Sequence, residues 1–428
     1  MNLLIIGSGA REHAFASKIK ESKHEVNIFA TNPNQGINFI SNAVKVDVND
    51  FNQIKNVIIK YSISFVLVGP EIPLINGIVD FIKADPVLYN VSIIGPSKSG
   101  SRLEGSKEFA KKFMNNHNIP TASYMTFSKE TLNEGIEFIK NNNPPYVLKA
   151  DGPAAGKGVI IVEAEHEAIT NLKEMLIQSK FGESSDKVVI EEFLTGIEMS
   201  CFVLFDGLNY KILPYAKDYK RIGERDKGLN TGGMGSISPV NFLNKNIKKQ
   251  IEKEIIEPTI NGLISEKIDY VGFIFIGLIN VNGQPKVIEY NVRMGDPECQ
   301  TILPKLKTDL LEIIEACCDK KLADINIEWT NKKSLCVVLC SKGYPDTYQK
   351  NILINNLENF NLDENNFIFH AGTKKENDEI YAIGGRVLNF ISLSDNFLQA
   401  RDEVHQSLKK LDWNGGFYRR DIGFKVIN

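Results

Sequence analysis

The sequence predicts an α/β protein with an N-terminal doubly wound parallel sheet, a larger α/β core carrying a small hinged subdomain, and a C-terminal α+β module of barrel-like form. Three observations predict this class. Strand-like and helix-like segments alternate over residues 1–102. Two strand-like runs flank a Gly-rich loop within residues 146–162. Short strands replace the alternation from about residue 327. A chain of 428 residues is long enough for several such units.

The N-terminal domain, residues 1–104, alternates between buried strands and helices. The strands read LLIIG, EVNIFA, SFVLVGP and VSIIGP, and the helices read GSGAREHAFASKIK, FNQIKNVIIKY and IPLINGIVDFIK. This order is typical of a parallel sheet covered on both faces. Ligands of such sheets bind at the carboxyl ends of the strands, so we expect a site there.

The first turn of this domain resembles a dinucleotide-binding turn but does not complete it. Gly7 and Gly9 fit that motif, whereas Glu12 occupies the third glycine position and the second strand ends without an acid for a ribose. We therefore exclude a nicotinamide cofactor. The turn remains open to two interpretations, a purely structural turn or a phosphate site at the helix N-terminus with Arg11 and His13 nearby.

Residues 105–118 predict a linking helix, and residues 119–191 predict the small hinged subdomain. Lys107 lies in the first turn of the helix, where a cation opposes the helix dipole, so it is either solvated or close to an anion. The subdomain contains the hairpin YVLKADGPAAGKGVIIV, whose loop ends in Gly156, Lys157 and Gly158. It is not a Walker A loop, because one spacer residue and the metal-binding hydroxyl are missing and a strand follows. The alternatives are a phosphate-binding lid and a tight surface turn.

The core, residues 192–326, contains two further polar segments. A long segment, KDYKRIGERDKGLNTGGMGSISP, predicts an irregular loop whose Lys, Arg and Gly residues suit an anionic ligand. Further on, Glu289, Asn291 and Arg293 share one face of a predicted strand. A carboxylate and an amide oxygen in this pattern suit Mg²⁺, although a solvated polar face gives the same pattern. The C-terminal module, residues 327–428, shows no nucleophile–base pair.

Composition narrows the function classes. The net charge of −3 predicts no nucleic-acid partner, and no apolar run is long enough to span a membrane. The N-terminus reads as a strand without a basic leader, and the six cysteines show no metal-binding spacing. We therefore expect a cytoplasmic protein with reduced thiols.

Nine segments in this order resemble the ATP-grasp ligases and, more narrowly, the glycinamide ribonucleotide synthetase (phosphoribosylamine–glycine ligase) family. They are GSGAREHA, GPEIPL, IIGPSKSGSRLEGSKEFAKKFM, VLKADGPAAGKGV, VIEEFLTGIEMS, NTGGMGSISP, VIEYNVRMGDPE, FHAGT and RRDIGF. The resemblance covers essentially the whole chain. It implies a pre-ATP-grasp N-terminal domain and an ATP-grasp core whose lid is residues 119–191.

The resemblance also implies roles for individual residues. The ATP-binding residues are Lys107, Lys149, Gly156, Lys157, Gly158, Glu191, Glu192, Phe193, Leu194 and Glu198. The metal ligands for Mg²⁺ or Mn²⁺ are Glu289 and Asn291. The catalytic residues are Arg293 and Asp296. The substrate-binding residues are Gly9, Ala10, Arg11, Glu12, His13, Asp218, Lys220, Arg221, Asn230, Gly232 and Gly233.

The implied reaction is an ATP-dependent ligation of glycine to phosphoribosylamine through glycyl phosphate, in de novo purine biosynthesis. The implied partners are these small molecules, and we expect a monomer. The sequence departs from the family pattern at two positions. Ala10 stands where the family's first turn has glycine, and Cys299 follows GDPE where a hydroxyl residue is expected. The alternatives are another ATP-grasp carboxylate–amine ligase, a purine-pathway carboxylase, or a nucleotide-binding module without turnover.

Overall fold

Five parallel strands form the N-terminal sheet, in the order β5-β4-β1-β2-β3. The computed structural model describes residues 1–154, 157–357, 360, 362–411 and 413–427. The strands are β1 (Asn2–Ile6), β2 (Asn27–Thr31), β3 (Asn42–Val44), β4 (Phe65–Val68) and β5 (Ser92–Pro96). The helices are α1 (Ala10–Lys20), α2 (Gln35–Asn38), α3 (Phe51–Lys60), α4 (Glu71–Asn76), α5 (Ile78–Ala84) and α6 (Lys98–Gly105). The predicted doubly wound sheet is confirmed.

Four details of this domain differ from the sequence prediction, one of which is helix α6, where no helix was predicted. Strand β3 and helix α2 were not predicted, because each is too short to show a period. The predicted helix IPLINGIVDFIK is two helices, α4 and α5, since Gly77 between them adopts φ +94°. That left-handed conformation ends a helix and is readily adopted by glycine.

The core continues the N-terminal sheet, whereas the sequence analysis treated the two as separate layers. Strand β16 (Tyr270–Val281) pairs antiparallel with β5 through Val271 opposite Gly95. The sheet extends through β10 (Ile197–Phe205), β11 (Tyr210–Ile212) and β17 (Gln284–Asn291) to nine strands. The remaining helices of this region are α10 (Lys245–Ile251), α11 (Glu257–Ser265), α12 (Glu298–Ile302) and α13 (Leu310–Cys318).

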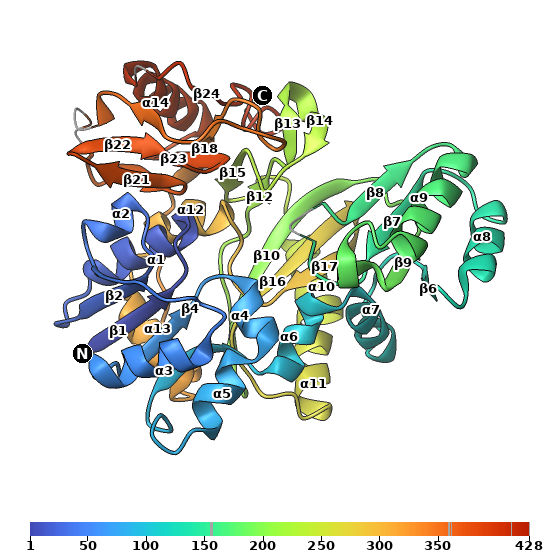
Figure 1. The fold of residues 1–428 in the computed structure, drawn as a ribbon, viewed down its shortest axis with the longest axis horizontal. Coiled ribbons are helices and arrows are strands. Elements are labelled where there is room, and N and C mark those ends of the chain that lie inside the picture. The colour runs from blue at the N-terminus through green and yellow to red at the C-terminus, as the bar shows by residue number, and fades with distance from the viewer. Residues whose placement is uncertain (155–156, 358–359, 361, 412, 428) are drawn as a thin grey trace.

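The lid subdomain projects to one side of this sheet (Figure 1). Its four-stranded sheet has the order β6-β9-β7-β8. The elements are β6 (Tyr124–Ser128), α8 (Leu132–Lys140), β7 (Tyr146–Ala150), β8 (Val159–Val162), α9 (Glu165–Ile177) and β9 (Lys187–Glu191). Strands β7 and β8 form the predicted antiparallel hairpin. The subdomain has a hydrophobic core of its own and follows the linking helix α7 (Lys107–Asn116).

The C-terminal module contributes four strands to a six-stranded sheet, whose other two strands come from residues 217–238, and it contains a small three-stranded sheet. Its elements are β18 (Lys333–Ser341), β19 (Ile352–Ile354), β20 (Asn366–His370), β21 (Thr373–Glu376), β22 (Glu379–Ala382), β23 (Arg386–Ser394), α14 (Phe397–Lys410) and β24 (Gly416–Phe417). In the described part of the chain, no helix is both long and apolar enough to cross a membrane.

The long polar segment predicted to be irregular is ordered, so that prediction was wrong. It contains β12 (Lys217–Asp218), β13 (Arg221–Gly223), β14 (Lys227–Asn230) and β15 (Gly235–Ser238). Strand β15 pairs with β18, and β13 pairs with β14 as a hairpin. The pairing partner of β15 lies about a hundred residues away, so local sequence patterns could not predict it. The segment thereby joins the core to the C-terminal sheet.

Candidate active site

Strand β17 presents Glu289 and Asn291 on the same face, as the alternation predicted. Gly277 of β16 lies opposite Glu289, where an added Cβ would lie 3.0 Å from Glu289 Cγ. The glycine therefore leaves room for the glutamate side chain. Asn291 Oδ1 accepts a hydrogen bond of 3.0 Å from Arg293 Nη2. This contact fixes the amide so that its oxygen, the atom that a hard cation would use, has a defined position.

Lysines from three different elements surround Glu289. Lys220 Nζ lies 3.4 Å from Glu289 Oε1, and Lys107 and Lys149 also act on it through charge. Burial raises the pKa of Glu289, but these three cations outweigh burial and hold the pKa below its usual value. Glu289 is therefore ionised at neutral pH. These lysines supply ammonium groups of the kind that bind a polyphosphate.

The Gly-rich loop is tied to helix α7 through Asp151. Ser106 Oγ donates to Asp151 Oδ1 at 3.0 Å, and the Glu108 backbone N–H donates to the same oxygen at 2.7 Å. Lys107 Nζ donates to the carbonyl of Gly152 at 3.3 Å. Lys107 is thus held beside the loop, and burial lowers its pKa.

At the tip of the loop, Lys157 is exposed. An added Cβ at Gly158 would lie 2.7 Å from the Ala154 Cβ, so this position has no room for a larger residue. Gly156, which was predicted to bind ATP, lies outside the described residues. Lys157 thus lies on a solvent-accessible loop between β7 and β8.

A buried charge cluster lies where the lid meets the core. Glu191 Oε2 accepts from Lys149 Nζ at 2.9 Å and lies 3.1 Å from Lys111 Nζ. All three side chains are less than a tenth exposed. The sequence analysis did not single out Lys111, because a lysine in a helix reads as a solvated residue unless the partner strand is known.

The predicted ATP-binding segment from Glu192 to Leu194 follows directly after β9 and is open to solvent. Glu192, Phe193 and Glu198 are exposed, and Leu194 is partly exposed. The Ser123 N–H donates to Glu192 Oε2 at 3.2 Å. Lys217 Nζ donates to the Glu198 carbonyl at 3.2 Å. The segment forms an accessible edge beside the charge cluster.

On the opposite side, Arg293 is held by acidic residues of the N-terminal domain. Glu104 Oε1 lies 2.6 Å from Arg293 Nη2, and Glu71 Oε2 lies 3.5 Å from Arg293 Nε. Glu104 also accepts from the Val292 N–H at 2.8 Å. Burial raises the pKa of Glu104 despite the attraction of Arg293. The spacing along the chain gave no sign of Glu104, which precedes Arg293 by almost two hundred residues.

Asp296 is bound by a residue of the C-terminal module. Arg386 Nη2 lies 3.1 Å from Asp296 Oδ2, and Arg386 Nη1 donates at 2.8 Å to the carbonyls of both Asp296 and Gly232. Burial raises the pKa of Asp296, but Arg386 and Arg11 outweigh it, so the pKa lies below the usual value. Arg386 therefore joins two predicted site segments, those of Gly232 and Asp296.

The predicted site residues between β12 and β15 lie in different environments, some of them buried or partly buried and others exposed to solvent. Lys220 Nζ lies 3.9 Å from Asp218 Oδ2, and burial raises the pKa of Asp218. Burial and Asp218 also raise the pKa of the neighbouring Glu298 to about 7. Gly233 adopts φ +117°, and an added Cβ would lie 2.5 Å from Pro297. Arg221 and Asn230 pair across the β13–β14 hairpin, where Asn230 is exposed.

In the first turn, the Glu12 side chain lies against both Gly7 and Gly9. The Gly9 N–H donates to Glu12 Oε2 at 2.6 Å, and Arg11 Nε donates to Glu12 Oε1 at 2.7 Å. Arg11 Nη1 reaches the Met294 carbonyl at 3.2 Å. Burial disfavours the charged guanidinium, but Glu12, Asp296 and Glu71 more than offset this and raise the pKa of Arg11. The Ala10 methyl is fully buried.

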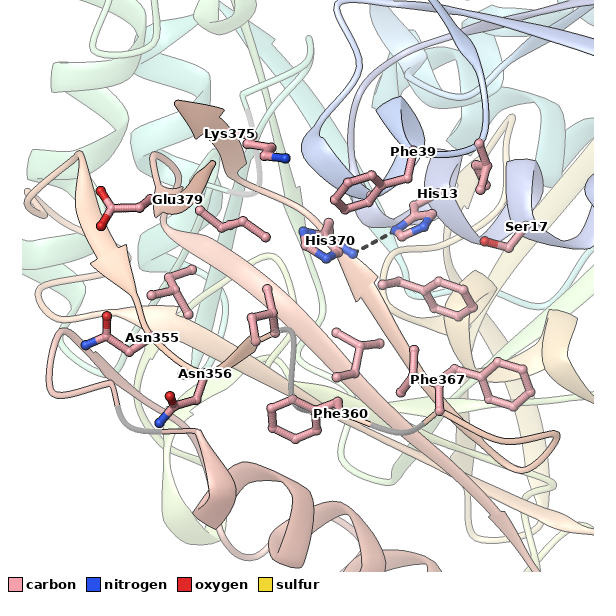
Figure 2. Close-up of a pocket in the computed structure, with 18 of the residues that line it drawn as sticks. His13, Ser17, Phe39, Asn355, Asn356, Phe360, Phe367, His370, Lys375 and Glu379 are labelled. Atoms are coloured by element: carbon pink, nitrogen blue, oxygen red, sulfur yellow. Dashed lines mark hydrogen bonds between the residues drawn. The ribbon is translucent and has the colours of Figure 1, made fainter. Parts of the chain in front are cut away.

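His13 turns away from these residues toward the C-terminal module. Figure 2 shows its ring beside His370, and the His370 N–H donates to His13 Nδ1 at 2.8 Å. Both histidines line a cavity of about 820 Å³ between α1, α2 and the C-terminal strands. Burial, together with His370, lowers the pKa of His13 well below its usual value. A neutral ring bonded in this way joins the two domains and offers no charge to a phosphate.

Three parts of the chain match one family. Residues 1–104 match the phosphoribosylglycinamide synthetase N domain, residues 105–299 its ATP-grasp (A) domain, and residues 334–425 its C domain. The chain belongs to the phosphoribosylglycinamide synthetase family. The family predicted from sequence is therefore confirmed.

Relatives of this family match the chain over its length. The phosphoribosylamine–glycine ligase of Fusobacterium nucleatum subsp. nucleatum is 41% identical over 426 residues, covering 99% of this chain and 98% of its own. That of Pasteurella multocida is 40% identical over 430 residues, covering 100% and 98%. The crystal structure of phosphoribosylamine–glycine ligase from Thermotoga maritima superposes with a TM-score of 0.84 at 31% identity, covering 99% and 100%.

The fold extends beyond the phosphoribosylglycinamide synthetase family. The biotin carboxylase domain of the Hydrogenobacter thermophilus 2-oxoglutarate carboxylase has a TM-score of 0.72 at 17% identity, covering 97% of this chain and 91% of its own. At that identity the likeness shows a shared fold alone.

Within the family, Cys299 was noted as a departure. Its thiol is buried and lies 3.9 Å from the Arg11 carbonyl, so it packs beneath the first turn.

Proposed function

We propose that this chain joins glycine to phosphoribosylamine at the expense of ATP, giving glycinamide ribonucleotide, ADP and phosphate. The proposal rests on one observation. Lysines from α7, β7 and the segment after β12 lie around Glu289, which shares a face of β17 with Asn291. Family membership supports the choice of substrates. A cytoplasmic location and a monomeric state remain predictions.

The oxygens of Glu289 and Asn291 fit a divalent cation such as Mg²⁺ or Mn²⁺. Glu289 is ionised, since its pKa lies below the usual value, and the Asn291 oxygen has one lone pair beyond its bond to Arg293. Both are hard oxygen donors, which Mg²⁺ prefers. When bound, the cation would neutralise charge on the ATP phosphates.

The lysines would bind the phosphate chain while the lid covers it. Lys107, Lys149 and Lys220 lie around Glu289, and Lys157 lies on the lid loop. Glycine carboxylate attacks the γ-phosphorus, and the bond to ADP breaks, giving glycyl phosphate. Such a transfer depends on positioning and charge neutralisation rather than on a nucleophilic side chain. A closed lid would keep water from the acyl phosphate.

The second step places phosphoribosylamine between Arg11, Arg293 and Asp296. Its amine attacks the acyl carbon, inorganic phosphate leaves, and the nitrogen loses a proton. Asp296 stays ionised, so it suits a hydrogen bond from the amine. Arg293 is held by Glu104 and Asn291, so its guanidinium is ordered before substrates arrive.

The test is a panel that measures ADP release with each acceptor in turn. Release that needs both glycine and phosphoribosylamine supports the proposal. Release with bicarbonate and an aminoimidazole ribotide instead would replace it with a carboxylase.

A further inference from the structure

Lys111 is a buried lysine to which neither the family resemblance nor the proposed mechanism gives a role. Its side chain is 2% exposed. Nζ donates to Thr121 Oγ1 at 2.8 Å and to the Ala122 carbonyl at 3.4 Å, and it lies 3.1 Å from Glu191 Oε2. An ammonium group has three donors, so these three oxygens account for all of them.

Packing does not explain an amine at this position. A buried cation loses its hydration, and burial lowers the pKa of Lys111 to about 8. Methionine would fill a similar volume without that cost. The neighbouring Lys112 shows the ordinary alternative, since it is 62% exposed and pairs with Glu108 on the helix surface.

The contacts of Lys111 connect the lid to the strand with the predicted metal ligands. Thr121 Oγ1 accepts from Lys111 and donates at 2.7 Å to the Val287 carbonyl of β17. Val287 stands two residues before Glu289. On the other side, Glu191 ends lid strand β9 and accepts from Lys149 of lid strand β7. The path from β17 to Lys149 is therefore continuous and passes through the Lys111 amine.

The shared carboxylate oxygen also affects Lys149. Glu191 Oε2 meets both lysines, so its charge is divided between Lys111 and Lys149. Without Lys111, Glu191 would pair with Lys149 alone and would hold it more strongly. The Lys149 ammonium would then be neutralised more fully by Glu191 and would attract an incoming phosphate less strongly.

We propose that Lys111 is a positioning residue for ATP, which fixes Glu191 against strand β17 and keeps Lys149 available to the nucleotide phosphates. This inference rests on the proposed function, because it takes ATP as the ligand. Lys111 itself touches no substrate. Its effect reaches the nucleotide through Glu191 and Lys149.

The test compares Lys111→Met with the matched control Lys112→Met, which removes the same charge from the next residue. For Lys111→Met we expect the dissociation constant and the KM for ATP to rise about tenfold, as for one lost charge-assisted contact. The KM for glycine should stay within about twofold. The melting temperature is expected to fall, because the Ala122 carbonyl and Glu191 lose a buried donor, so the KM values and not the stability decide the test. Lys112→Met should match the parent in all four measurements.

Thr121→Val supplies a second, independent variant, since it removes the link to Val287 and keeps the shape of the side chain. It should raise the KM for ATP in the same direction. Parental ATP binding in both Lys111→Met and Thr121→Val overturns the inference. A lower melting temperature with equal rises in the KM values of all substrates also overturns it, because that pattern indicates a structural role. If Lys111→Met does not fold, Thr121→Val decides alone.

Calorimetry on the parent separates this inference from the proposed function. A parent that binds no ATP contradicts the proposed function. A parent that binds ATP as tightly as both variants contradicts the role of Lys111 alone.

Discussion

Replacing Glu289 with alanine removes the carboxylate on which the metal site is built. The change leaves the backbone pairing of β16 and β17 intact, since Gly277 opposite needs no side-chain partner. The Glu289 side chain is 37% exposed and lies 3.4 Å from Lys220. A partly exposed pair of this kind contributes about 0–1 kcal/mol to stability. The variant should therefore fold and melt close to the parent.

The expected effect on turnover is much larger. Glu289 is the charged member of the predicted ligand pair, and its loss leaves Asn291 alone among the lysines. Removing one preorganised group that stabilises developing charge lowers kcat by about 10²–10³-fold, which is roughly 3–4 kcal/mol. The apparent requirement for Mg²⁺ should rise at the same time, because the site has lost its anionic oxygen.

The assay follows ADP release at saturating ATP, glycine and phosphoribosylamine while Mg²⁺ is varied. Glu254→Ala is a suitable control, since Glu254 is an exposed glutamate on another element. The control should keep the parental rate and Mg²⁺ dependence. If Glu289→Ala also keeps both, then Glu289 is not a metal ligand and the reasoning from the β17 face is refuted.

Three further outcomes are expected. Lys157→Ala should raise the KM for ATP about tenfold with little change in melting temperature, because Lys157 is exposed; normal ATP saturation would make the hairpin structural. Arg11→Ala should raise the KM for phosphoribosylamine more than that for ATP, and equal rises would place the acceptor elsewhere. Burial and Asp218 raise the pKa of Glu298 from 4.5 to about 7, so the folded protein favours the protonated carboxyl. The stability that this preference contributes is fully present below pH 4.5 and is lost as pH rises through 7. Glu298→Gln should therefore be more stable than the parent at about pH 8, by at most about 3 kcal/mol, and equal to it below about pH 4 in unfolding experiments; equal stability at both pH values would contradict the assignment.

Local patterns sufficed for the parts of the fold in which neighbours in sequence are neighbours in space. The alternation over the first hundred residues predicted the parallel sheet, and the period of two placed Glu289 and Asn291 on one face. The two runs around the Gly-rich loop predicted the β7–β8 hairpin.

Contacts between distant segments were beyond those patterns. Glu104 and Arg293, Arg386 and Asp296, and Lys111 and Glu191 are each joined by tertiary packing, and no spacing rule relates them. The same limit explains β15, which pairs with the C-terminal strand β18, and β12, which pairs with β15. The structure therefore adds the residues that hold the predicted site residues in place.

The most direct test of the proposed ligase is the substrate dependence of ADP release by the parent enzyme. We expect ADP release only when glycine and phosphoribosylamine are both present, with glycinamide ribonucleotide formed in equal amount. ADP release that is independent of phosphoribosylamine, or that needs bicarbonate in place of glycine, would contradict it.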